Sequence, residues 1–381
     1  MSALALPPDE ELVPFNDYGP QFRIAAQADS PHIKCFDLRR LTSWTTPSDD
    51  FFAFHQTQTA RADAGDWRLR IGGLVKRPAE FSLQDLLNRT GRRDLAATIE
   101  CSGNSGNPRL MNGLVSNAVW TGVSLAAVLN ECVVEPEARE VVFLGMDSEQ
   151  EKKWEAGNAA YLSPHGRSLY VQDAQSPENL LAFAMNGKPL LPDHGFPLRL
   201  VIPGWYGMAQ VKWLTRIEVI DRRYEGRHMA RNYQSLRAVP SPEGTLWLDT
   251  SISRNNLKSV IARVTRRRLP SKPPSTPGAR FEYKIAGAAW GGPSRIETVE
   301  VQVDGEAWRP AHIDQRNGGF AWVLWSLDWR DLAPGPHVLV SRAVNVRGET
   351  QPTRAELRSH LVSNREDNSQ WSRSVEIEAA G

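Results

Sequence analysis

The chain has 381 residues, and its 45 basic and 44 acidic side chains leave a formal net charge of +1. So even a balance gives no indication of a nucleic-acid partner or of attraction to a membrane surface. No apolar run approaches the roughly 18 residues that a membrane-spanning helix needs. The length exceeds what one hydrophobic core usually serves, so the sequence predicts two domains, at residues 1–248 and 249–381.

The N-terminal residues and the cysteines bear on location and on metal content. Residues 1–20 carry acids and prolines, without the basic segment and apolar run of a secretory signal. We therefore expect a cytoplasmic protein, or a periplasmic one if the sequence has been trimmed. The three cysteines are too widely spaced for a disulfide framework, and without a CxxC pair they give no support for an iron–sulfur cluster or a zinc ribbon. Cys35 and Cys132 are predicted to be small buried apolar residues.

The first half of the chain mixes helix and strand patterns. Residues 67–75 alternate as in a strand, and Ser82 begins a helix whose third residue, Asp85, completes a capping box. A second helix begins after Ser124, and a third is predicted over residues 176–187. Residues 198–202 read as a buried strand. Because helices and strands do not alternate regularly, this half is predicted to be α+β.

The second half has a different pattern. From Phe281 onward, apolar residues of one parity recur in short segments separated by turn signals such as Asp304-Gly305. These segments are residues 281–285, 299–303, 320–324, 338–340 and 344–346. The pattern predicts an all-β sandwich. Between the halves, residues 266–278 are proline-rich and basic, which indicates a solvated loop or a docking patch for an acidic partner.

The segment with the clearest chemical content is residues 98–106, in which Cys101 stands between an apolar stretch and a turn rich in glycine. Glycine lets a bulky ligand approach the backbone, and a thiolate is a soft metal ligand. Taken alone, Cys101 could equally be an inert buried thiol.

Several further segments decide between these interpretations because they occur in a fixed order. They are residues 101–104, 120–123, 193–197, 203–207, 211–214 and 289–292. With them the chain resembles the sulfite oxidase family of molybdenum-cofactor enzymes, over nearly everything from Asp50 to Trp371. The resemblance implies a molybdopterin-binding catalytic domain followed by an immunoglobulin-like dimerisation domain. It also implies Mo-molybdopterin with one molybdenum per subunit bound to Cys101, no haem, and a homodimer.

The pterin cofactor carries a phosphate and many ring donors and acceptors, so its site needs cations and amides. Arg199 and Lys212 match the family's phosphate-binding positions. Outside their motifs they would be ordinary surface charges, and His194 an ordinary core histidine. The resemblance implies cofactor contacts at Phe52, Ala53, Phe54, His55, Gln56, Asp147, His194, Arg199, Gln210, Val211 and Lys212.

The predicted substrate side departs from the family pattern. Phe54 stands where the family has an arginine, Gln56 where it has a histidine, and Phe183 where we place its pocket tyrosine. Trp120 and Arg295 remain as pocket residues. Each lost charge-assisted hydrogen bond removes roughly 1.5–3 kcal/mol of anion binding, so a more apolar pocket is expected. Phe54 and Phe183 could instead be plain core residues.

The resemblance implies oxygen-atom transfer, with Cys101, Arg295, Trp120, Phe54 and Phe183 at the reacting centre. The first hypothesis is oxidation of sulfite to sulfate, with electrons passing to a separate partner protein. The second is a related enzyme that acts on another small anionic or sulfur-containing substrate, such as a sulfoxide or nitrate-like reductase. The third is a non-catalytic dimeric relic, which an intact set of cofactor residues argues against.

Overall fold

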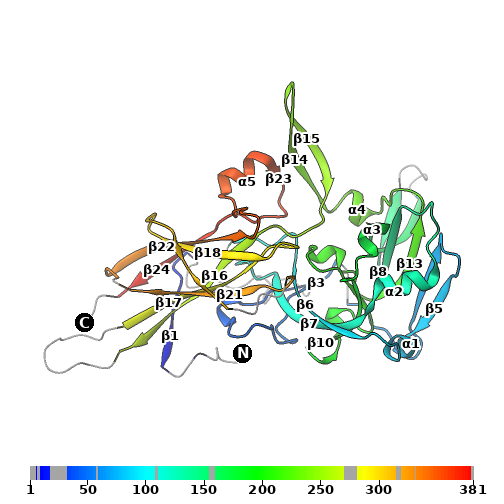
Figure 1. Ribbon diagram of the computed structural model, residues 1–381, viewed down its shortest axis with the longest axis horizontal. Helices are drawn as coiled ribbons and strands as arrows, with labels where there is room; N and C mark the ends of the chain where they lie inside the picture. Colours follow the sequence, from blue (N-terminus) through cyan, green and yellow to red (C-terminus); the bar gives the residue numbers. More distant parts are fainter. Residues whose placement is uncertain are drawn as a thin grey trace.

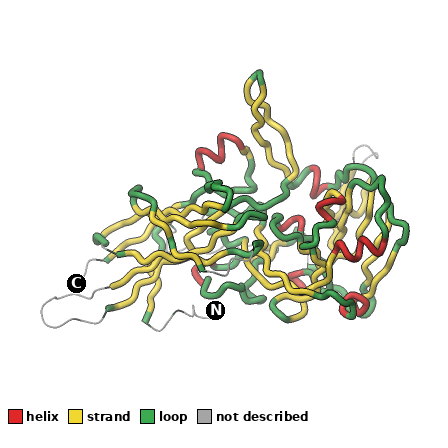
Figure 2. Tube along the Cα trace, viewed as in Figure 1, coloured by secondary structure: helices red, strands yellow, loops and turns green. Residues whose placement is uncertain are grey.

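The structure is a computed structural model that describes residues 6, 9–17, 32–56, 59–107, 110–153, 159–269, 281–314, 319–330 and 332–378. Strands dominate and the helices are short (Figure 2). The N-terminal half forms one end of an elongated molecule and the C-terminal half the other, with one hairpin projecting between them (Figure 1). Of the proline-rich segment predicted at residues 266–278, residues 270–278 lie outside the described part.

Two sheets build the N-terminal unit. The first has the order β5 (Ala79–Ser82), β4 (Arg68–Gly73), β13 (Leu214–Ile220), β8 (Glu140–Lys153) and β9 (Ala159–Tyr170). The second has the order β11 (Lys188–Pro189), β10 (Leu180–Met185), β7 (Val115–Ser124) and β6 (Arg93–Glu100), and β12 (Arg199–Val201) also pairs with β10. Only β4 and β13 pair in parallel among the described strands.

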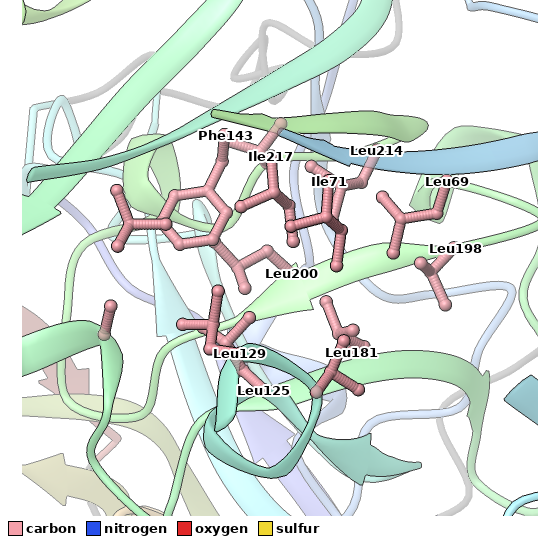
Figure 3. Packing of buried hydrophobic residues seen from close by; sticks show 14 of the residues in the cluster. Leu69, Ile71, Leu125, Leu129, Phe143, Leu181, Leu198, Leu200, Leu214 and Ile217 are labelled. Carbon is pink, nitrogen blue, oxygen red and sulfur yellow. The ribbon is translucent and has the colours of Figure 1, made fainter. Parts of the chain in front are cut away.

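The core of this unit lies between the two sheets. Leu69 and Ile71 of β4, Phe143 of β8 and Ile217 of β13 meet Leu181 of β10 (Figure 3). All five side chains are almost completely buried. At roughly 1.5–3 kcal/mol per buried side chain, this layer is a main stabilising element of the unit.

The helices confirm part of the predicted pattern. Helix α1 (Leu83–Leu87) begins at Ser82 with the predicted capping box, and α2 (Leu125–Cys132) begins at Ser124, whose hydroxyl accepts from Ala127 N. Cys132 is buried, as predicted. The remaining helical turns are α3 (Val171–Ala174), α4 (Arg227–Ala230), α5 (Arg354–His360), η2 (Leu38–Arg40), η4 (Pro192–His194) and η5 (Gly207–Ala209). The first half is thus mostly β with short helices.

The helix predicted over residues 176–187 is wrong, because its apolar part is strand β10. Leu181 and Phe183 face the core of the N-terminal unit, whereas Leu180 and Met185 face a second cluster on the other side of the sheet. A strand covered on both faces is apolar throughout, so its sequence lacks the alternation that distinguishes it from a buried helix.

The C-terminal unit is a pair of packed sheets. One has the order β1 (Glu10–Val13), β16 (Lys258–Arg268), β17 (Phe281–Trp290), β21 (Val323–Trp329) and β20 (His312–Ile313). The other has the order β19 (Arg309–Pro310), β18 (Ile296–Val303), β22 (Gly335–Asn345) and β24 (Ser372–Ile377). Their facing side chains form one core.

Two predictions for this unit have different outcomes. Val299, Val301 and Val303 are buried in β18 as expected. The parity predicted for the strand near Val338 is wrong, since β22 buries Leu339 and Ala343 whereas Val338 is 46% exposed. Two-residue alternation alone does not say which face meets the core when both parities carry apolar side chains.

The two units are joined along the chain and in space. Strand β1 lies in the C-terminal sheet, and the predicted boundary at residue 248 falls within β15 (Gly244–Ser251). This strand pairs with β14 (Gln234–Ser241) in the projecting hairpin, and β23 (Leu361–Val362) pairs with β14 near its base. The remaining pair is β2 (Ile33–Lys34) with β3 (Ala53–Phe54). A hydrophobic cluster with residues from both units, including Trp120 and Trp322, packs between them.

In the described residues, no helix has the length and apolar character to span a membrane.

A partly exposed histidine–aspartate pair in the C-terminal unit predicts pH-dependent stability. His337 Nδ1 lies 2.6 Å from Asp304 Oδ2, and His337 Nε2 lies near the Ala333 carbonyl. Burial alone would lower the pKa of His337, but these two contacts together raise it. A raised histidine pKa adds stability below its unfolded value and loses it as pH rises through the folded value. We expect His337→Asn to cost about 0.2–1 kcal/mol at pH 5.5 and less at pH 8.5, measured by urea unfolding. An equal or larger cost at pH 8.5 would contradict this.

Candidate active site

One pocket collects most of the predicted site residues. It encloses about 700 Å³ of space between atoms, including its open mouth. Its walls come from β3, the end of β6, β8, β9, the turns η4 and η5, and the segment before β14. Cys101 follows the last residue of β6 and lines this pocket as a half-buried thiol.

The surroundings of Cys101 have opposing effects on its charge. Burial raises the pKa of the thiol, whereas the Gly103 N–H and the Arg365 guanidinium favour the thiolate. The Cys101 N–H donates to Leu114 O at 2.9 Å, which ties the start of the loop to the strand beside it. A bound metal ion would add the positive charge that a coordinated thiolate requires.

Arg199 and Lys212 place two cations in the same pocket. Arg199 is 4% exposed, and its guanidinium donates to the His194 and Gln210 carbonyl oxygens at 3.1 and 3.2 Å. Lys212 Nζ donates to the carbonyls of Phe54 and Asp193, each at 3.1 Å. Burial lowers the pKa of Arg199 to about 9 and that of Lys212 to about 7.

His55 and His194 complete the polar wall as uncharged rings. Burial is the main cause that lowers the pKa of His55 to about 4 and that of His194 to about 3. His55 Nδ1 lies 2.6 Å from Lys212 Nζ, so the neutral ring accepts from the ammonium group. Its other nitrogen then faces Asp193 Oδ1 at 3.5 Å.

Asp147 reaches the pocket from an irregularity in β8. The register with β9 shifts between Leu144 and Ser148, and Gly145 leaves the space in which Asp147 folds back. A Cβ on Gly145 would collide with the Asp147 carboxylate and with the Lys212 carbonyl. Burial raises the pKa of Asp147 to about 6 although Lys212 opposes the shift.

These donors fit an anionic cofactor rich in hydrogen-bonding groups. Arg199 Nε and Asp147 Oδ1 are buried and have no hydrogen-bond partner in the structure. Arg199 pairs with no carboxylate of the described residues, and a buried cation is costly unless an anion neutralises it. A pterin phosphate would neutralise the cation, and the pterin ring would offer partners to the unpaired polar atoms. The Cys101 thiolate lies in the same pocket as a ligand for the metal.

The Arg199 environment predicts opposite effects on cofactor binding and on stability. Arg199→Met should lower the pterin-to-protein ratio of purified protein. It should raise the melting temperature of cofactor-free protein, because it removes an uncompensated buried charge. The exposed Arg216, paired with Glu218, provides the control Arg216→Met, which should change neither quantity. A cofactor-free melting temperature that falls for Arg199→Met would contradict the interpretation.

Near Cys101 the pocket wall includes a tyrosine, and an arginine outside the lining packs against that tyrosine. Tyr233 lines the pocket, and its hydroxyl accepts from Gln56 Nε2 at 2.7 Å. Arg365 places its guanidinium carbon 4.5 Å from the centre of the Tyr233 ring. A Cβ on Gly103 would lie 3.9 Å from both Arg365 Nη1 and Cys101 Sγ. Burial raises the pKa of Tyr233 to about 12, so its hydroxyl remains a donor.

The structure brings most of the predicted site residues together. Those that line the pocket are Phe52, Ala53, Phe54, His55, Gln56, Cys101, Asp147, His194, Arg199, Gln210 and Lys212. Their individual roles stay predictions. Val211 is buried in the core of the N-terminal unit instead, and its carbonyl accepts from Leu200 N.

Three predicted pocket residues are not in its wall. Phe183 packs in the core of the N-terminal unit, and Arg295 is an exposed residue just before β18. Trp120 lies one layer behind, with the Arg199 guanidinium carbon 4.8 Å from its ring centre. Tyr233 nevertheless adds a hydroxyl to the pocket wall, and Arg365 places a cation against the Tyr233 ring, so the surroundings of Cys101 are more polar than the sequence predicted.

The residues that sequence reasoning missed come from distant segments. Tyr233 precedes the projecting hairpin, Arg365 follows β23, and His165 comes from the middle of β9. No local spacing connects these residues to Cys101.

Comparison with known families gives two matches. The family described as oxidoreductase molybdopterin binding domain matches residues 55–228. The family described as Mo-co oxidoreductase dimerisation domain matches residues 249–375. The first range contains most of the pocket lining, and the second contains Arg365.

Individual proteins show the same relationship. Nitrate reductase [NADH] 2 of Phaseolus vulgaris is 29% identical over 347 residues, which cover 83% of this chain and 38% of that protein. Nitrate reductase [NADH], clone PBNBR1405, of Brassica napus is 30% identical over 77% of this chain and 34% of its own length. The chain thus spans just over a third of these relatives. The crystal structure of the sulfane dehydrogenase SoxCD from Paracoccus pantotrophus matches with a TM-score of 0.76 and 29% identity, covering 93% of this chain and 89% of that one.

Proposed function

The chain belongs to the sulfite oxidase family of molybdenum-cofactor oxidoreductases, and we propose that it oxidises a small anionic sulfur compound, with sulfite as the first candidate. The observation that carries the proposal is the Arg365 guanidinium stacked on Tyr233 beside Cys101. When bound, the molybdenum cofactor supplies oxygen-atom transfer and accepts two electrons. The protein supplies a charged and hydrogen-bonding recess at that point.

Each residue on this side has a distinct part in binding. Arg365 has no ion pair with a carboxylate in the described residues, so its charge is available to an anion. The Tyr233 hydroxyl can donate to a substrate oxygen while it accepts from Gln56. The neighbouring Phe54 narrows the pocket without adding charge. A compact anion with exposed oxygens suits this set.

In the proposal, Arg199, Lys212 and Asp147 hold the pterin and its phosphate. Separate cation groups for cofactor and substrate allow the substrate to leave while the cofactor stays bound. The overall reaction converts sulfite and water to sulfate, two protons and two electrons. We propose that the electrons pass to a separate partner protein and that no haem is bound by this chain.

The choice of a sulfur substrate is supported by the extent of the structural match. The sulfane dehydrogenase SoxCD chain aligns over most of both chains, whereas the nitrate reductases share just over a third of their length. The second candidate is accordingly a sulfane sulfur substrate, which the same match favours. Reduction of nitrate and a non-catalytic role are the alternatives that the experiment below distinguishes.

The test begins with molybdenum and pterin analysis of purified protein and continues with steady-state assays. Sulfite and thiosulfate are tested with ferricyanide as acceptor, and nitrate with a reduced dye as donor. We expect one molybdenum per subunit and saturable turnover of sulfite. Metal-loaded protein that oxidises thiosulfate alone would support the sulfane candidate. Turnover of nitrate alone, or of none of the three, would overturn the proposal.

The C-terminal unit carries the proposal for assembly. Because it matches a dimerisation domain, we propose a two-fold homodimer formed through this unit, with an immunoglobulin-like arrangement of its two sheets. Light scattering at micromolar concentration should give twice the mass of one chain, and a monomer would contradict this part.

A further inference from the structure

The residue that precedes Cys101 is a buried charge. Glu100 is 1% exposed, at the end of β6. Its Oε1 accepts from Lys258 Nζ and from Asn104 Nδ2, each at 3.0 Å, and its Oε2 accepts from Trp290 Nε1 at 2.8 Å. Lys258 and Trp290 belong to β16 and β17, so the C-terminal unit provides two of the three donors.

The partner cation is equally enclosed and holds the far end of the same loop. Lys258 is 1% exposed, and its ammonium also donates to the carbonyls of Asn104 at 3.3 Å and Asp367 at 2.7 Å. Asn104 in turn donates its N–H to the Cys101 carbonyl at 2.9 Å. One lysine therefore fixes the residue before the cysteine and the residue three positions after it.

A further bond ties the middle of the loop to the C-terminal unit. The Glu366 N–H donates to the Ser102 carbonyl at 2.6 Å, and the Glu366 carboxylate pairs with Arg237. Arg365 is the neighbouring residue. The segment that carries the substrate-facing arginine is thus attached to the loop that carries the metal-facing cysteine.

Net stability does not account for this arrangement. A buried ion pair gains little over a well-packed apolar pair of the same size, because both charges lose their hydration. What such a pair does provide is a fixed geometry, since every donor and acceptor must keep its partner. Glu100, Lys258 and Asn104 meet this condition completely around Cys101.

We propose that Lys258 and Trp290, acting through Glu100, are positioning residues that set the direction in which the Cys101 sulfur leaves its loop. The C-terminal unit then does more than mediate dimerisation, because it fixes the metal ligand and delivers Arg365 to the same place. The inference rests on the proposed role of Cys101 as the molybdenum ligand. It does not depend on which substrate is oxidised.

The experiment uses metal-loaded full-length protein and two variants. Lys258→Met removes the charge at similar length, and Trp290→Phe removes one hydrogen bond with little change of volume. The readout is the electron paramagnetic resonance spectrum of molybdenum half-reduced with dithionite, which reports on metal–sulfur geometry without any substrate. We expect shifted or broadened spectra in both variants, with the larger change in Lys258→Met. For whichever of sulfite and thiosulfate the wild-type protein oxidises, we expect kcat to fall by about 10–100-fold at similar KM.

A matched control separates positioning from simple destabilisation. Glu140 is 2% exposed and pairs with Arg223 at 2.8 Å in the N-terminal unit, outside the pocket lining. Arg223→Met therefore also breaks a buried carboxylate pair, and it should leave the spectrum unchanged. The double variant Glu100→Gln with Lys258→Met should recover stability but not the wild-type spectrum.

The outcomes are distinguishable from failure of the proposed function. Wild-type spectra from fully loaded Lys258→Met and Trp290→Phe, or equal changes in Arg223→Met, would overturn the inference. Changed spectra in a wild-type background that does not oxidise sulfite would sustain it while the substrate proposal fails. If Lys258→Met does not fold, Trp290→Phe decides the matter, and wild-type protein without molybdenum would overturn both.

Discussion

Replacing Arg365 by glutamine should raise the KM for sulfite about 10- to 100-fold while kcat changes much less. The half-buried guanidinium lies beside Cys101 and faces no carboxylate partner among the described residues. A charge-assisted hydrogen bond to a bound anion contributes roughly 1.5–3 kcal/mol, and each 1.4 kcal/mol is a factor of ten in affinity. Because the anion keeps its charge throughout the reaction, the loss falls mainly on binding. Steady-state kinetics at fixed ionic strength measure the effect.

Arg295 provides the matched control. It belongs to the same unit and was the arginine predicted from sequence, but its side chain is exposed outside the pocket. Arg295→Gln should leave both KM and kcat within about twofold of wild type, as for most exposed charges. Arg365→Lys should retain part of the affinity, since it keeps the charge but loses the planar fork. The reverse ranking of Arg365 and Arg295 would contradict the geometry described here.

The comparison of these two arginines shows what kind of information the sequence carries. The proposed cofactor residues Arg199 and Lys212 lie within short motifs that can be recognised from neighbouring residues in the chain. Arg365 reaches Cys101 only because β16, β17 and the segment after β23 dock against the end of β6. No pattern in one stretch of chain encodes that docking, whereas Arg295 stands next to a recognisable motif, and the sequence therefore favours Arg295.

The fold shows the same division between local and non-local information. The Ser82 capping box and the Asp304-Gly305 turn were predictable, since neighbouring residues determine them. The sequence of strand β10 resembles that of a helix because both faces of the strand are buried by elements distant in the chain. The inward face of β22 was misassigned for a related reason, because only the opposite sheet determines which parity is covered.

Cys101→Ser should have the largest effect on activity and should lower turnover by far more than a hundredfold. Loss of an outer partner of a metal ligand typically costs 10–100-fold, and loss of the ligand itself costs more. A serine hydroxyl is harder and far less acidic than a thiol, so it binds a soft or high-valent metal weakly at neutral pH. The pterin should remain bound, because Arg199, Lys212 and Asp147, which we propose as its contacts, do not depend on the sulfur.

Pterin and molybdenum contents measured separately, together with kcat, make this prediction decisive. We expect near wild-type pterin, reduced or geometrically altered molybdenum, and almost no turnover in Cys101→Ser. Cys35→Ser is the matched control, since Cys35 is also half-buried but lies outside the pocket, and it should behave like wild type. Substantial turnover by Cys101→Ser would mean that the loop held by Glu100 and Lys258 serves packing alone, and the assignment of this pocket as the metal centre would have to be abandoned.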